Sequence, residues 1–290
     1  MRTTSCVVCG RAMRALCAFP DTGRTVLRCG CGHRTLAPFP DERELAARYG
    51  REAYYAEDLA ALHDDLRVGY DPASPIIASY RQRLAAIADL APPPARLLEV
   101  GCARGVFLDL AAKAGYAASG IEMNPHGAAY AREKFGLDVA TGAFGPGMTA
   151  PGAFGAVASY DTIEHVADPR GFMSAVAGAL APGGVAAIGT PDASSPLLAA
   201  AEFAAVATGG RWRYPLWRVY GDGVEHLHLF TRGGLARLAR ETGLEPVSFH
   251  GYSIPVRNMR DLSPPYALAL RLASALPYEF TMLARKPLGP

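Results

Sequence analysis

Hydrophobic and polar positions follow two alternating patterns in the chain after residue 95. Short apolar runs predict buried strands of a parallel sheet; they cover residues 95–100, 116–123, 137–144, 154–161 and 183–191. Stretches with apolar residues three and four positions apart predict helices; these cover residues 105–115, 125–135 and 169–180. Repeated strand–helix units predict an α/β fold, with a Rossmann-like, mostly parallel sheet and helices on both of its faces.

Two long insertions interrupt this alternation near the end of the chain, over residues 193–230 and 253–276. The last predicted elements are a helix capped by Thr231 and strands over residues 246–252 and 278–286. In parallel sheets of this kind, ligands bind at the carboxyl ends of the strands. We expect both insertions to lie on the substrate side of such a site.

The chain before residue 95 divides into two further parts. Residues 1–42 contain five of the six cysteines, and residues 43–94 contain helical patterns. The triplet Pro92-Pro93-Pro94 then marks a boundary that a helix does not cross easily. We therefore predict a zinc-ribbon-like module over residues 1–42, a helical linker or lid over residues 43–94, and the α/β domain over residues 95–290.

Composition and charge narrow the classes of function. The chain has 290 residues, 50% of them hydrophobic, and a net charge of +2, so no strong field favours nucleic acid or acidic lipid. The longest uncharged run, residues 171–191, is broken by Pro182-Gly183-Gly184, which argues against a membrane span. The first residues lack the apolar core of a signal peptide. We predict a cytoplasmic protein with a small-molecule substrate and neither nucleic acid nor membrane as a partner; the sequence leaves the oligomeric state open.

A carboxylate and two glycines follow the first strand of the α/β part. The stretch LLEVGCARGVFL places Glu99 near the end of the strand and Gly101 and Gly105 in the turn after it. A dinucleotide-binding turn needs three glycines, G-x-G-x-x-G, and here there are only two. The carboxylate of Glu99 would repel a pyrophosphate and attract a cation. The motif therefore predicts a positively charged ligand without phosphate.

Glu122 adds a contact for a ribose. It lies 21 positions after Gly101, at the end of the second strand. At this position in nucleotide sites, an acid accepts hydrogen bonds from the ribose hydroxyls. A ligand with a ribose and an ammonium group but no phosphate is S-adenosylmethionine, which we predict as the cofactor.

These motifs, together with SYDTIEHVADP after the fourth strand and APGG before the fifth, resemble those of the class I S-adenosylmethionine-dependent methyltransferases. They are most similar to the small-molecule branch related to ubiquinone-biosynthesis methyltransferases, over about residues 95–290. The resemblance implies seven strands, the last one antiparallel to the rest. It also implies cofactor contacts from Glu99, Gly101, Cys102, Ala103, Gly105, Glu122, Met123, Ala143, Phe144, Tyr160 and Asp161. Ala103-Arg104 departs from the family pattern, in which a small residue and Thr or Ser are common.

Methyl transfer requires alignment of the acceptor and, for a hydroxyl or an amine, removal of a proton. His165 in DTIEHVADP and His226 in EHLHLFT are the candidate catalytic bases. For each, the competing interpretation is a structural histidine that bonds a backbone group. Similarity to quinone-modifying relatives also leaves open a divalent metal at the pair Glu164-His165.

Aromatic residues of the insertions and of the linker are candidate substrate contacts. The predicted substrate-binding residues are Tyr55, Trp212, Tyr214, Trp217 and His228. An aromatic and basic lid of this kind would suit a flat or sugar-like acceptor. The competing interpretation is that these residues pack on the main domain.

The cysteines near the start of the chain have spacings typical of a zinc site. Cys6 and Cys9 are two thiols three positions apart with a glycine after the second, and the second half reads Cys29-Gly-Cys31-Gly-His33. We predict a structural Zn²⁺ held by Cys6, Cys9, Cys29 and Cys31, with His33 as the alternative fourth ligand. Four protein ligands leave no open position for catalysis.

The sequence therefore predicts a methyltransferase that uses S-adenosylmethionine and acts on a small molecule, with an oxygen of a secondary metabolite or a sugar-like compound as the acceptor. Three alternatives stay open. They are an N- or C-methyltransferase of the same fold, a nicotinamide-dependent oxidoreductase, and a non-catalytic protein that uses this fold to bind a partner.

Overall fold

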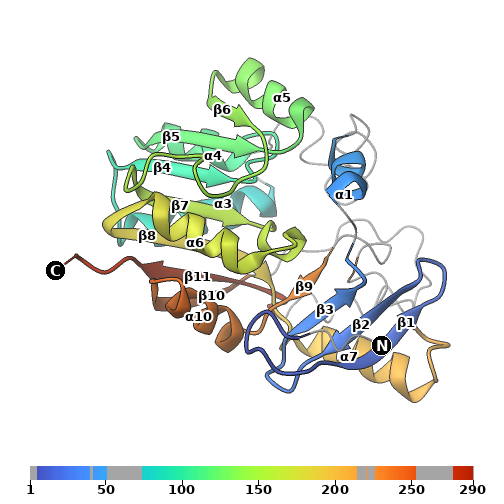
Figure 1. The fold of residues 1–290 in the computed structure, drawn as a ribbon. Helices are drawn as coiled ribbons and strands as arrows, with labels where there is room; N and C mark the ends of the chain where they lie inside the picture. The colour runs from blue at the N-terminus through green and yellow to red at the C-terminus, as the bar shows by residue number, and fades with distance from the viewer. Residues whose placement is uncertain are drawn as a thin grey trace.

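The computed structural model describes residues 5–39, 42–50, 74–213, 220, 226–252 and 277–289. A seven-stranded sheet in the order β10-β11-β8-β7-β4-β5-β6 forms its larger part (Figure 1). These strands are β4 (Arg96–Val100), β5 (Ala117–Glu122), β6 (Asp138–Thr141), β7 (Phe154–Tyr160), β8 (Leu180–Pro191), β10 (Glu245–Tyr252) and β11 (Glu279–Arg285). Only β11 runs antiparallel to its neighbours β8 and β10. The predicted Rossmann-like α/β class is confirmed.

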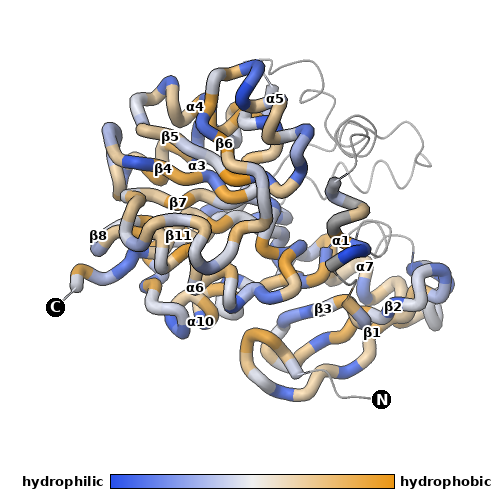
Figure 2. The backbone as a smooth tube through the Cα atoms, turned by 45° about the horizontal axis from the view of Figure 1, so that its top comes forward, coloured by the Kyte–Doolittle hydropathy of each residue, from blue (hydrophilic) through white to orange (hydrophobic). Residues whose placement is uncertain are grey.

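Helices cover both faces of this sheet because successive residues of each strand point to opposite sides. Leu97 of β4 belongs to the apolar core under α3 (Pro75–Ala88), α4 (Val106–Lys113) and α5 (Pro125–Phe135). Leu98 belongs to the core under α6 (Pro169–Ala179) and α10 (Arg232–Glu241). Figure 2 shows the hydrophobic colouring running through the strands and the helices that flank them.

Side-chain caps fix where several of these helices begin. The Asn124 side chain accepts hydrogen bonds from the backbone N–H groups of His126 and Gly127, and Pro125 occupies the first turn of α5. Asp168 and Thr231 cap α6 and α10 in the same way. The caps place the first turns of the helices beside the carboxyl ends of the strands that precede them.

The strand predicted over residues 183–191 is longer than expected. It begins at Leu180, which pairs with Phe154 of β7 before a shift in register. The shift lets the strand ladder continue past Gly183, which has a positive φ of 77°. The Pro-Gly-Gly stretch therefore lies inside β8 and does not end it.

A second, four-stranded antiparallel sheet contains the Cys-rich segment; we call it the Cys-rich sheet. It consists of β1 (Arg14–Phe19), β2 (Arg24–Arg28), β3 (Arg34–Ala37) and β9 (His228–Leu229). The first three strands lie near the start of the chain, whereas β9 comes from the end of the first insertion. The larger domain therefore contributes a strand to the Cys-rich sheet, and the domain boundaries drawn from the sequence stay a prediction.

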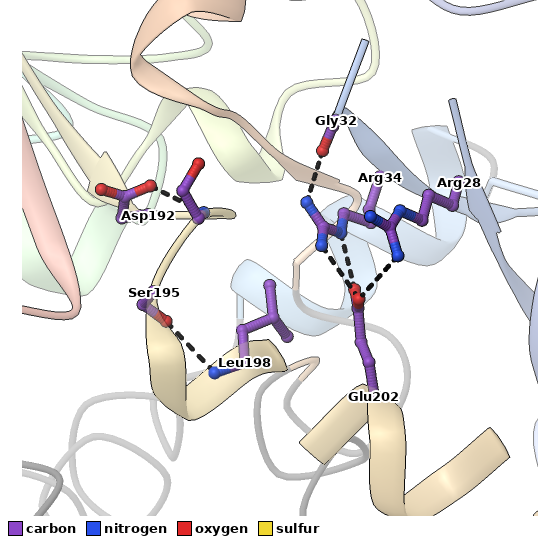
Figure 3. Close-up of polar contacts among 8 residues, drawn as sticks. Arg28, Gly32, Arg34, Asp192, Ser195, Leu198 and Glu202 are labelled. Atoms are coloured by element: carbon purple, nitrogen blue, oxygen red, sulfur yellow. Dashed lines mark hydrogen bonds and ion pairs between the residues drawn. The ribbon is translucent and has the colours of Figure 1, made fainter. Parts of the chain in front are cut away.

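The same insertion contains α7 (Pro196–Ala207), which lies against the Cys-rich sheet. Glu202 of this helix is 5% exposed and accepts hydrogen bonds from Arg34, at 2.6 Å from Nε and 2.9 Å from Nη2 (Figure 3). Arg28 lies 3.5 Å from the same carboxylate. This two-bond ion pair fixes the orientation of α7 on the Cys-rich sheet. Because both side chains are buried, loss of either partner would leave the other charge uncompensated.

Helix α1 (Glu42–Tyr49) is the one remaining α-helix of the described residues. Every described helix is too short or too polar to pass through a bilayer.

Candidate functional site

The turn after β4 is built around its two glycines. Gly101 has a φ of +73°, and a Cβ there would lie 2.3 Å from Oγ1 of Thr162. Gly105 has a φ of +76°, and a Cβ there would lie 2.8 Å from the Cβ of Ala131. Only glycine meets both requirements without strain. The backbone therefore passes close to the loop after β7, at the carboxyl edge of the sheet.

The Glu122 carboxylate, at the end of β5, is fixed by two backbone donors. Its Oε2 accepts from the N–H of Ala103 and its Oε1 from the N–H of Asn124, both at 2.8 Å. A carboxylate has about four acceptor sites, so a side chain held in this way can also accept from a ligand hydroxyl. The two motif regions read from the sequence, the glycine turn and the acid 21 positions after it, are thus joined by a hydrogen bond.

Glu99 is a buried carboxyl group at the same edge of the sheet, and its pKa is raised. It is 5% exposed, and its Oε2 has no hydrogen-bond partner among the described residues. Burial, together with the nearby charge of Glu122, raises the pKa of Glu99 well above its usual range. A cation placed here would supply the missing partner and stabilise the charged form. These residues therefore fit a ligand that carries positive charge and a ribose, as S-adenosylmethionine does.

Cys102 and Met123 flank these acids and differ in exposure. Cys102 is buried, and a Cβ on Gly120 would lie 2.7 Å from its Sγ, so the thiol fills space against β5. Burial also raises the pKa of this thiol, which makes it a poor nucleophile. Met123 is 38% exposed beside the edge.

The four predicted cofactor contacts at and after the ends of β6 and β7 differ in burial. Ala143 is exposed, and the half-buried ring of Phe144 meets Phe172 edge-on at 5.6 Å. Tyr160 is buried, with its ring 4.9 Å from that of Phe107 on the α4 side of the sheet. Asp161, directly after it, is exposed at the carboxyl edge. Of these four, Ala143 and Asp161 are the exposed ones.

Three residues form a second cluster, which we call the histidine face: Glu164, His165 and His226. The rings of His165 and His226 lie 4.9 Å apart, and Nδ1 of His165 is 3.0 Å from the hydroxyl of Tyr49. Glu164 is fully buried and accepts from Thr190 at 3.0 Å; burial and the charge of Asp161 raise its pKa well above the usual range. Each of the three residues offers a ligand atom within 4.8 Å of the others, so the cluster could hold a metal ion.

His228 lies away from the histidine face. It is fully buried, and its Nδ1 is 3.2 Å from Nε2 of His33 and 3.2 Å from Oγ1 of Thr35. Burial lowers the pKa of His228 to about 4 and, with the charge of His228, the pKa of His33 to about 3. Both rings are neutral at pH 7, inside the contact between β3 and β9.

The predicted aromatic lid can be located only in part. Trp212 is 68% exposed just after α7. Tyr55, Tyr214 and Trp217, and the whole second insertion, lie outside the described residues. A substrate role for these residues stays a prediction.

The four cysteines chosen from the sequence lie together. Sγ of Cys6 is 3.7 Å from that of Cys31, and Sγ of Cys9 is 3.4 Å from that of Cys29. All four sulfurs lie within 4.8 Å of one another. His33, the alternative ligand, points instead toward His228. Four thiols in this arrangement have the chemistry of a structural zinc site.

Sequence reasoning missed one buried charged pair at the carboxyl edge. Arg83 of α3 is 1% exposed, and its Nη2 donates to Glu279 at 2.8 Å. The guanidinium also lies over the rings of Tyr160, at 4.6 Å, and Tyr252, at 4.7 Å. Burial and the charge of Asp161 raise the pKa of Glu279 to about 8. The sequence carries no signal for this pair, because its two members are 196 positions apart.

Comparisons with known proteins identify the family and the fold. The family described as "Methyltransferase domain" matches residues 73–248. A ubiquinone biosynthesis O-methyltransferase of Cereibacter sphaeroides is 30% identical over 186 residues, which are 60% of this chain and 72% of that protein. The protein of the same name from Caulobacter vibrioides is 35% identical over 115 residues, 38% of this chain, and the match spans about half (46%) of its length.

A solved structure shows the same fold. It is the 1,6-didemethyltoxoflavin-N1-methyltransferase of Burkholderia thailandensis, with its substrate and S-adenosylhomocysteine bound. The TM-score is 0.55 at 16% identity, and the alignment covers 93% of this chain and 98% of that one. At this identity the likeness concerns the fold alone.

Proposed function

Since this chain belongs to the methyltransferase-domain family, we propose that it transfers the methyl group of S-adenosylmethionine to an oxygen of a small molecule, such as a secondary metabolite or a sugar-like compound. The observation that carries the cofactor assignment is the pair Glu99 and Glu122 on adjacent strand ends. Within the described part of the chain, a buried oxygen of Glu99 has no hydrogen-bond partner, whereas Glu122 is fixed by two backbone donors. The names of the two O-methyltransferase relatives support an oxygen acceptor.

S-adenosylmethionine, when bound, supplies an activated methyl group with its own leaving group. The protein's task is then to orient the acceptor, to exclude water and to remove the acceptor's proton. Alignment alone can supply about 7–11 kcal/mol in favourable cases. Glu122 would bind the ribose hydroxyls, and Glu99 would stabilise positive charge next to the glycine turn.

The histidine face supplies the base in this proposal. His165 is held by the hydroxyl of Tyr49 at 3.0 Å, and His226 lies beside it. A neutral imidazole in this position accepts the acceptor's proton as the methyl group is transferred, which contributes roughly 10²–10⁴-fold in rate. His165→Ala and His226→Ala, compared at saturating cofactor, distinguish the base from its neighbour by the larger fall in kcat.

We also propose that Cys6, Cys9, Cys29 and Cys31 hold a structural Zn²⁺. The close approach of the four sulfurs supports this. So does the lowered pKa of Cys9, about 7, where burial is outweighed by hydrogen bonds from the Arg11 backbone and the neighbouring cysteines. Burial raises the pKa values of the Cys6 and Cys31 thiols, and the charge of a bound zinc would lower them, because zinc binds the thiolate form.

Ligand-induced stabilisation tests the cofactor assignment. We expect S-adenosylhomocysteine to raise the Tm of the protein and NAD to leave it unchanged, because only the first ligand combines a ribose and an ammonium group without phosphate. Stabilisation by NAD alone would favour the nicotinamide-dependent alternative. Binding of S-adenosylhomocysteine without methyl transfer to any oxygen, nitrogen or carbon acceptor would favour the non-catalytic one.

A further inference from the structure

Leu227, the residue before β9, is hydrogen-bonded through both its backbone carbonyl and its backbone N–H. Its carbonyl accepts from the N–H of Leu36 at 2.9 Å and from Oγ1 of Thr35 at 2.9 Å, both on β3 of the Cys-rich sheet. Its own N–H donates to the carbonyl of Glu164 at 2.8 Å. Leu227 and Glu164 are fully buried, and Thr35 is 2% exposed. We call these four residues the Leu227 seam.

The Leu227 seam joins two clusters that are distant in the sequence. On one side, β3 begins three positions after Cys31, so its register follows from the cysteine cluster. On the other side, Glu164 belongs to the histidine face and His226 immediately precedes Leu227. The position of the His226 ring beside His165 therefore depends on where β3 holds the peptide of Leu227.

The Thr35 hydroxyl has a more specific task than satisfying a buried carbonyl. The Leu227 carbonyl already accepts from Leu36, so it would not be left without a partner if the hydroxyl were missing. A second donor to the same oxygen restricts the orientation of the Leu227–His228 peptide, and therefore the backbone of Leu227, whose N–H donates to Glu164 and which directly follows His226. The same hydroxyl lies 3.2 Å from Nδ1 of His228, which His33 also contacts.

We propose that the Cys-rich sheet positions the histidine face for methyl transfer, and that Thr35 is the positioning residue, acting through Leu227. This inference rests on the proposed function, because it gives the histidine face its role beside the acceptor. It also explains why a Cys-rich segment accompanies the larger domain. The Cys-rich sheet acts on the histidine face, where the acceptor would bind. It does not act on the cofactor edge, the ends of β4 and β5 that carry Glu99 and Glu122.

Three variants test the proposal. Thr35→Val removes the hydroxyl at nearly constant volume, Thr35→Ser keeps it, and Thr25→Val makes the same change on the neighbouring strand β2, at a half-buried residue away from Leu227. The readouts are the ring resonances of His165 and His226 by NMR of histidine-labelled protein, and the affinity for S-adenosylhomocysteine by calorimetry. The His226 resonance is assigned with His226→Gln, and that of His165 with His165→Gln.

We expect Thr35→Val to shift the resonances of both rings, and Thr35→Ser and Thr25→Val to leave them as in the wild type. The affinity for S-adenosylhomocysteine should be the same in all four proteins. With an accepted substrate, kcat should fall on the order of tenfold in Thr35→Val alone, because small misplacements of catalytic groups are costly. Unchanged ring resonances in Thr35→Val, or equal shifts in Thr25→Val, would overturn the proposal.

The same spectra separate this inference from the proposed function. If the wild type fails to bind S-adenosylhomocysteine, the proposed function fails, while the ring resonances still decide whether Thr35 positions the histidines. Amide exchange of the wild type covers the case in which Thr35→Val does not fold. The amides of Leu36 and Leu227 should open in one step in mild denaturant. A Leu227 amide that stays protected after that of Leu36 has exchanged contradicts the coupling.

Discussion

The cofactor edge at Glu99 and Glu122 and the Leu227 seam are assembled in opposite ways. The first lies within one strand–helix–strand unit, and its Glu122 carboxylate is fixed by the backbone N–H groups of residues 103 and 124. The Leu227 seam joins residues from three distant parts of the chain, Thr35, Glu164 and Leu227. The geometry of the local unit follows from nearby residues, whereas the Leu227 seam forms only when distant parts of the chain have packed together.

This difference separates cofactor binding, which many proteins of this fold share, from acceptor recognition, which depends on this protein's own Cys-rich sheet. Any class I fold with a suitable turn and a ribose-binding acid can bind the cofactor, because backbone geometry does most of the work. The acceptor side depends on the fit between the Cys-rich sheet and the larger domain. Changes to the Cys-rich sheet should therefore affect acceptor chemistry and leave cofactor binding nearly intact, and changes to the edge should do the reverse.

The largest effect is expected from loss of a cysteine ligand. Cys29→Ser should abolish metal binding, from about one zinc per chain to near zero, because a tetrahedral structural site needs all four ligands. The Cys-rich sheet should unfold locally, since metal binding and folding of such modules are coupled. Metal analysis and the affinity for S-adenosylhomocysteine are the two measurements, and the affinity should persist.

Cys17→Ser is the matched control, because Cys17 is also buried but packs in the separate apolar core with Phe19 and Leu198. It should retain its zinc. A Cys29→Ser protein with a full complement of metal would rule out the four-thiolate site. Loss of cofactor affinity in the same variant would remove the distinction between the two regions.

The next effect concerns the ion pair that fastens α7 to the Cys-rich sheet. Glu202→Ala leaves the guanidinium of Arg34 buried without its carboxylate, which should lower the free energy of unfolding by about 3–5 kcal/mol. Urea denaturation measures this loss. Glu241→Ala is the control, because its side chain is 33% exposed and solvent screens its pairs with Arg170 and Arg237, so their loss should lower the free energy of unfolding much less. Equal losses in both variants would contradict the buried-pair interpretation.

At the cofactor edge, the sharpest variant is Glu122→Ala. It removes the proposed acceptor for the ribose and the carboxylate to which the N–H groups of Ala103 and Asn124 donate. A charged hydrogen bond contributes about 1.5–3 kcal/mol, so the affinity for S-adenosylhomocysteine should fall roughly 10- to 150-fold. Calorimetry measures the affinity, and Glu133→Ala, an exposed acid on α5, should leave it unchanged. Unaltered affinity in Glu122→Ala would place the cofactor elsewhere.

The same contrast explains what could be predicted from the sequence. The central strands were predictable because each is a continuous apolar run, and α5 and α6 because a cap and a first-turn proline announce them. Helix α7 begins with the same signal, Ser195 followed by Pro196, yet it lay unrecognised inside an insertion. Strand β9 has only two residues, too few for any periodicity.

Site residues divide in the same way. Glu99 and Glu122 could be placed at neighbouring strand ends from the sequence, because each follows an apolar run within one strand–helix–strand unit; their contacts with the cofactor stay a prediction. The proximity of the four cysteines could be expected from their spacing, and the structure directs His33 to His228 instead; the bound zinc stays a prediction. Long-range pairs such as Arg83–Glu279 look like ordinary surface charges in the sequence, because nothing local reveals their burial.

The smallest effect is a pH dependence of the contact between β3 and β9. His33 and His228 have folded-state pKa values of about 3 and about 4, below the unfolded value of 6.5, because burial disfavours their charged forms. The unfolded chain therefore binds protons below pH 6.5 that the folded protein does not. The stability from these neutral rings is fully present above that pH and is lost as the pH falls toward 4.

Each neutral ring should contribute about 1 kcal/mol to the loss of stability between pH 7 and pH 5.5. Urea denaturation at several pH values measures the slope, and His228→Gln should flatten it because glutamine does not titrate. His250→Gln is the control, since His250 is exposed on β10 and should leave the slope as in the wild type. The buried carboxyls of Glu99 and Glu164 titrate in all three proteins, so the difference between slopes reports His228 together with its effect on the pKa of His33. An unchanged slope in His228→Gln would show that this contact already admits water.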